Sequence, residues 1–164
     1  MKEKQRSLLL DKIILISIAL LVLFAWVDSQ QIVFVKSLDN GTNGVWALFE
    51  HLRPVINLLW FGVLAAIALV WYLITQDKSE SLALFLTPAI LIFFGFQDLI
   101  YYVFSPIDTM PATMGCWANM MPPVRLLTII TGESCPTPAI FTTCALLGFL
   151  IAMYVFYKLK EMKG

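Results

Sequence analysis

The sequence predicts an all-α integral membrane protein: a four-transmembrane-helix antiparallel bundle with two structured extracytoplasmic loops, forming a single domain over residues 1–164. Hydrophobic residues make up 60% of the chain and charged residues only 13%. A water-soluble domain of this size could not bury that much apolar surface. The apolar residues gather in four stretches, each close to the ~20 residues that cross a bilayer as a helix. These stretches cover residues 8–27, 55–74, 82–104 and 139–157.

The first stretch follows a basic tail that contains Lys2, Lys4 and Arg6. A cleaved signal peptide would begin in the same way and continue with an apolar run. No small-x-small cleavage site follows the run at 13–26, so we expect an uncleaved first span.

The first outer loop, 28–54, is predicted to contain local structure. The β-branched run Ile32–Val35 is compatible with a short strand or with extra helical turns. A turn signal follows at 40–44. Apolar residues then recur at helical spacing over 45–53, which predicts a short amphipathic helix lying on the membrane. Pro54 separates this helix from the second span or opens that span.

A short polar joint, 75–80, connects the second and third spans and predicts that they are antiparallel neighbours. Ser79 or Ser81 can cap the third helix. Pro88 lies inside the third span and is expected to bend it, because proline removes one backbone hydrogen bond.

The second outer loop, 105–138, contains six prolines, which restrict its backbone. Within it, 122–132 predicts a brief helix with proline at its start and glycine at its end. We expect the two outer loops to form a small cap over the bundle.

Lysine and arginine are concentrated in the two termini and in the 75–80 joint, and are sparse in the long loops. This bias predicts a multi-pass protein of the plasma membrane with both termini cytoplasmic. The Asn40-Gly-Thr42 sequence matches a glycosylation sequon, whose use depends on the host.

Two cysteines, Cys116 and Cys135, lie in the second outer loop, and Cys144 lies in the fourth span. An outer location favours a structural disulfide between the first two, and two unpaired thiols are the alternative. A bridge would stabilise the fold by about 3 kcal/mol in the chain-entropy model. Cys144 is expected to be a free, buried thiol.

In its layout, with four spans and cysteines in an outer loop, the chain resembles the quinone-linked thiol oxidases of the bacterial disulfide-forming pathway. Those enzymes pass electrons onward through a Cys-x-x-Cys pair in the other outer loop. The first loop here, 28–54, has no cysteine. The resemblance therefore does not carry the relay that this chemistry requires.

A candidate polar site lies in the outer half of the third span, around Asp98. A carboxyl at this depth is costly unless it is protonated, paired or facing water. Tyr101 and Tyr102 lie three and four residues further along the helix, so either phenol can lie beside the carboxyl. Gln97 adds an amide. The functional interpretation is a polar pocket that opens outward.

The structural alternative is an ion pair between Asp98 and either Arg53 or Arg125, which would fix the outer loops to the bundle. His51, the only histidine, could join Glu50 and the carboxylates in an acid–base or metal site, but a solvated surface position is the simpler interpretation. No second histidine stands at metal-ligand spacing, so we predict no metal and no cofactor.

These observations favour a non-catalytic accessory or assembly subunit, or a lipid- or ligand-binding membrane protein with an outward-facing polar site near Asp98. The alternative is a membrane-embedded enzyme that acts on a lipophilic substrate at the outer leaflet. Expected partners are membrane lipids and other membrane subunits or a second copy. The chain has no basic surface for nucleic acid. A small transporter is disfavoured, because Ser17 is the only polar residue between Ile13 and Val27.

Overall fold

The computed structural model describes residues 2–38, 44–104, 118 and 121–162. This part of the chain is built from helices and contains no strand. The helices are α1 (Lys2–Leu38), α2 (Gly44–Thr75), α3 (Lys78–Phe93), α4 (Phe96–Phe104), α5 (Pro122–Thr131) and α6 (Pro138–Glu161).

Within the described residues, three helical segments are long and apolar enough to cross a membrane: Lys12–Leu38, Ala47–Thr75 and Pro138–Glu161. The pair α3 and α4 passes the same test when taken together, but the two helices meet at an angle of 66°. The described ranges therefore hold three candidate spans, or four if the bent pair is one span.

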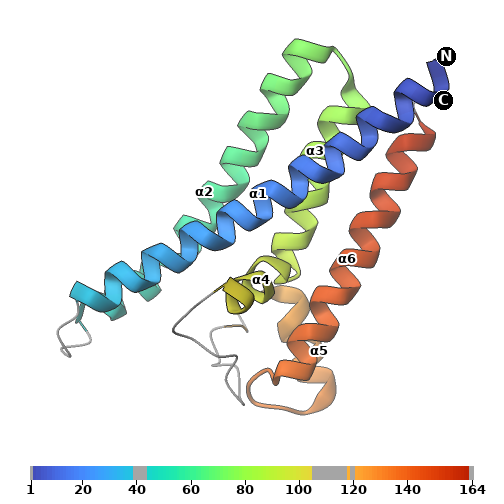
Figure 1. Cartoon of the computed structure of the whole chain (residues 1–164). Helices are drawn as coiled ribbons and strands as arrows, with labels where there is room; N and C mark the ends of the chain where they lie inside the picture. Colours follow the sequence, from blue (N-terminus) through green and yellow to red (C-terminus); the bar gives the residue numbers. More distant parts are fainter. Residues whose placement is uncertain (1, 39–43, 105–117, 119–120, 163–164) are drawn as a thin grey trace.

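Helix α3 lies between α2 and α6, and α1 crosses this layer (Figure 1). The buried side chains form successive clusters along the bundle. One end packs Ile13, Leu84 and Phe156 together, whereas the middle packs Phe24, Leu64 and Ala152. Residues from the start of α1 and the end of α6 thus lie at the same end of the molecule, close to the α2–α3 connection (Figure 1).

The predicted first outer loop is largely helical, as one of its two alternatives allowed, but its helices continue the spans. α1 continues as a helix to Leu38, so Ile32–Val35 forms extra helical turns rather than a strand. α2 begins at Gly44 and runs through Pro54, so the predicted membrane-surface helix is the first part of α2. Pro54 is the eleventh residue of α2, so it lies in the helix interior, where proline removes one backbone hydrogen bond without ending the helix here. The sequon at Asn40 lies outside the described residues.

The third span breaks at Phe94–Gly95 and not at Pro88, which lies inside the continuous helix α3. Gly95 has a φ of 80°, a backbone conformation that glycine adopts without a steric penalty. A Cβ at Gly95 would stand 3.0 Å from the Phe141 ring. Phe94, the other residue of the break, also packs on α6: a Cβ built at Gly148 of α6 would stand 2.3 Å from the Phe94 side chain. The bend is therefore packed tightly against α6.

Helix ends confirm one prediction and correct another. α5 begins at Pro122, and Gly132 follows its end with a φ of 75°, as the proline and glycine positions predict. At the start of α3, however, Asp77 is the cap, accepting a hydrogen bond from the Glu80 backbone N–H at 3.0 Å. Ser79 and Ser81 instead donate to the backbone carbonyls of Leu159 and Ala68, which links α3 to α6 and α2.

Candidate functional site

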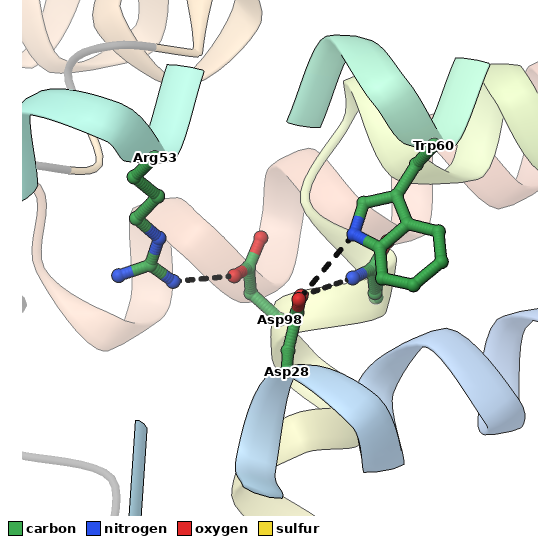
Figure 2. Close-up of polar contacts among 5 residues, drawn as sticks. Asp28, Arg53, Trp60 and Asp98 are labelled. Atoms are coloured by element: carbon green, nitrogen blue, oxygen red, sulfur yellow. Dashed lines mark hydrogen bonds and ion pairs between the residues drawn. The ribbon is translucent and has the colours of Figure 1, made fainter. Parts of the chain in front are cut away.

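The polar groups of the candidate site come from three helices whose side chains meet in one cluster (Figure 2). Asp28 is on α1, Arg53 and Trp60 are on α2, and Gln97 and Asp98 open α4. The break at Gly95 starts a new helix here, and this places two consecutive polar residues in its first turn. Acidic residues are favoured in a first turn because its backbone N–H groups carry partial positive charge.

Asp98 forms an ion pair with Arg53: Nη2 of the arginine donates to Oδ1 of the carboxylate at 3.3 Å (Figure 2). The Arg53 and Asp98 side chains are 21% and 15% exposed, so the pair is only partly shielded from solvent. Of the two arginines that the sequence offers, Arg53 is the partner. Arg125 is exposed on α5.

Asp28 accepts two side-chain hydrogen bonds. Trp60 Nε1 donates to Oδ1 at 3.3 Å, and Gln97 Nε2 donates to Oδ2 (Figure 2). The Trp60 ring also stacks on Phe24, with 4.2 Å between ring centroids. Asp28 therefore links all three helices, since its partners lie on α2 and α4.

Asp28 and Asp98 lie close enough to repel each other, and Arg53 attracts both carboxylates. Bringing two carboxylates together in an apolar environment is unfavourable unless cations and donors compensate. The arginine, the indole and the Gln97 amide supply part of this compensation.

Two amide oxygens are buried without a hydrogen-bond partner: Oε1 of Gln97, which belongs to this cluster, and Oε1 of Gln31, which lies one helical turn from Asp28 on α1. Gln97 is only 3% exposed. Gln31 lies three residues after Asp28 on α1, which places both side chains on one helix face. The orientation of the Gln97 amide follows from chemistry, because only its NH2 group can donate to a carboxylate.

The other predicted site residues are distributed around this cluster. Tyr101 is buried and packs with Ala25 and Ile32 of α1, and its ring meets Tyr102 edge to face. His51 is exposed on α2. The Glu50 side chain lies outside the part of the chain that the structure describes. The structure brings Asp98, Gln97 and Arg53 together, whereas it leaves His51 and Arg125 on the surface.

Trp60 and Gln31 are the members that sequence reasoning missed. In the sequence, Trp60 is one of many apolar residues of the stretch 55–74, and Gln31 falls in the predicted outer loop 28–54. A usable signal was present: Asp28 and Gln31 are spaced three apart just beyond the first apolar run. That spacing indicates a polar helix face once the helix is known to continue.

No group of three or more His, Cys, Asp or Glu side chains is placed to hold a metal within the described ranges. A separate hollow of about 340 Å³ lies near the α2–α3 connection, lined by Tyr72, Lys78, Ser81 and Leu82. It contains none of the candidate site residues.

Cys144 is a buried free thiol, as expected. The partner proposed for Cys135, Cys116, lies outside the described residues, so the predicted disulfide stays a prediction.

No protein-family model, curated protein or solved structure matches this chain.

Proposed function

We propose that this chain is a non-catalytic accessory or assembly subunit of a membrane complex, which packs laterally through α2 against a transmembrane helix of another subunit. The observation that carries this proposal is the uneven covering of the spans. Only 11% of the most apolar window of α2 is buried inside the molecule, against 33% for α1 and 39% for α6.

One face of α2 has the composition that close helix–helix packing in membranes favours. Gly62, Ala65 and Ala66 are exposed, and a Cβ built at Gly62 meets nothing within 4 Å. Leu58 and Leu69 flank these small residues on the same face and are 70% and 58% exposed. Small residues let two backbones approach closely, which increases van der Waals contact between spans.

The polar cluster supports a structural role over a catalytic one. Asp98 is the principal candidate for acid–base chemistry, and Arg53 holds it in an ion pair. The cluster joins α1, α2 and α4 and so fixes the outer part of α2, which otherwise packs mainly on α3. The alternative, an enzyme for a lipophilic substrate, requires a substrate group that displaces Arg53 from Asp98.

Site-specific photo-crosslinking tests the proposal. A photoreactive residue at Leu58 or Leu69 should give protein adducts of discrete mass in native membranes. Leu150 is the matched control, since it is 64% exposed on α6. Mass spectrometry of the adducts identifies the partner, and repeating the reaction with the purified protein tells a second copy from a different subunit. Adducts only to lipid at both α2 positions would contradict the proposal.

A substitution sharpens this test. Gly62→Leu should abolish the adducts without lowering the melting temperature of the isolated chain, because the added side chain enters open space and leucine favours a helix more than glycine does. Adducts that persist at wild-type yield in this variant would show that the small face of α2 is not the contact.

A further inference from the structure

We propose that the cluster of Asp28, Asp98, Gln97 and Gln31 binds one monovalent alkali cation, with Na⁺ as the probe. This inference does not depend on the proposed assembly role of α2. It concerns the polar cluster at the candidate site and assigns a ligand to that cluster.

The net charge of the cluster favours a bound cation. The described side chains of the cluster contribute two carboxylates and one guanidinium, which leaves one negative charge in excess when all are ionised. Among the described residues, the charges that act on Asp98 are those of Arg53 and Asp28. Lys36 lies eight residues beyond Asp28, or about 12 Å along α1. An uncompensated charge among apolar spans is unfavourable, so one further positive charge suits the site.

Two buried amide oxygens without a hydrogen-bond partner also favour a bound cation. Gln97 is nine-tenths buried, its amide is directed at Asp28, and its Oε1 has no partner. Gln31 Oε1 is buried without a partner one helical turn from Asp28. Burying a carbonyl oxygen without a donor is costly. Carboxylate and carbonyl oxygens together are the donor set that hard cations prefer.

A cation accounts for both features at once. A single proton on either carboxyl would remove the excess charge but would add only one donor, which leaves at least one amide oxygen without a partner. An alkali ion accepts several oxygen ligands and neutralises the charge in the same step. The Asp98 and Arg53 side chains are both partly exposed, so the protein itself does not seal the cluster.

Thermal melts of the full-length protein in detergent provide the test. Na⁺ is raised from zero to about 0.15 M, with choline chloride keeping the ionic strength constant so that screening does not change. We expect a saturable rise of a few degrees in melting temperature, because a ligand that binds only the folded state stabilises it. Identical melts in Na⁺ and in choline at every concentration would overturn the proposal.

Three variants locate the effect. Asp28→Asn removes the excess negative charge and keeps an acceptor for the Trp60 indole. Gln97→Met removes the amide oxygen that has no hydrogen-bond partner. Each variant should lose the rise in melting temperature with Na⁺. Glu161→Gln is the matched control, since it removes an exposed carboxylate paired with Lys158, and it should keep the response.

A full Na⁺ response in Asp28→Asn would overturn the proposal. Stabilisation by lowered pH with no dependence on Na⁺ would also contradict it, because a proton would then be the ligand. The wild-type titration decides the question even if a variant does not fold.

Discussion

Asp98 shows how a single residue in an apolar stretch acquires its role from partners that are distant in sequence. Its carboxylate meets Arg53, which lies 45 positions earlier, and its neighbour Gln97 meets Asp28, which lies 69 positions earlier. The need for compensation could be predicted from the position of Asp98 inside a span. The choice of Arg53 over Arg125 could not, because it depends on how far α2 extends beyond the membrane.

Substitution of Asp98 separates a structural tie from a binding site. Asp98→Leu leaves the Arg53 guanidinium without this carboxylate, and we expect a loss on the order of 2 kcal/mol in the free energy of unfolding. This is below the ~3–5 kcal/mol of a fully buried pair, because both side chains keep some exposure. Asp98→Asn keeps an oxygen for Arg53 and should lose about 1 kcal/mol or less. Thermal melts in detergent compare the two, and equal stability of both variants would refute the structural tie.

The cysteines provide a second prediction at this scale. We expect Cys116 and Cys135 to be joined, while Cys144 remains free and buried. Mass spectrometry of peptides prepared without reductant should find the first two in one linked species. Recovery of both as alkylated thiols, from protein prepared without reductant, would exclude the bond.

At the scale of the elements, the break in the third span is the feature that the sequence did not predict, since only a bend at Pro88 was expected. Pro88 is the obvious helix breaker, yet α3 continues through it and ends at Phe93. The break depends on Gly95, whose positive φ and contact with Phe141 arise from the packing of α6. Neither feature leaves a pattern in the local sequence. The positions of the apolar helices along the chain, and the short helix α5, depend on local signals and were predictable.

A pair of glycine substitutions tests this account of the break. Gly132→Ala forces a positive φ on alanine in open space and should cost about 1 kcal/mol. Gly95→Ala carries the same backbone penalty and also places its Cβ 3.0 Å from the Phe141 ring, so we expect a loss larger by about 1–3 kcal/mol. Chemical denaturation in detergent measures both. Equal losses would mean that the bend is not packed against α6.

A second pair concerns the contact between α3 and α6. Gly148→Ala should destabilise the protein, because its Cβ would stand 2.3 Å from the Phe94 side chain. Gly62→Ala should be neutral or should stabilise by up to about 1 kcal/mol, since alanine favours a helix and meets no neighbour there. The melting temperatures should therefore move in opposite directions, or only that of Gly148→Ala should fall. A stable Gly148→Ala variant would contradict the tight packing at this point.

At the scale of the whole molecule, we propose that α3 and α4 together cross the membrane as the fourth span. Four spans place both termini on one side, and the arrangement of the core agrees, since Ile13 of α1 and Phe156 of α6 pack at the same end. If the bent pair instead enters and leaves on one side, only three spans cross. The termini would then lie on opposite sides of the membrane.

Cysteine-accessibility labelling in intact cells distinguishes these arrangements most directly, with single cysteines placed at Ser37, Gln76 and Glu133, all of which are exposed. The four-span account, with the orientation that the basic residues predict, requires Ser37 and Glu133 to react with an impermeant reagent from outside. Gln76 should then react only after permeabilisation. If Glu133 behaves like Gln76, the bent pair does not span the membrane, and the four-helix bundle is contradicted.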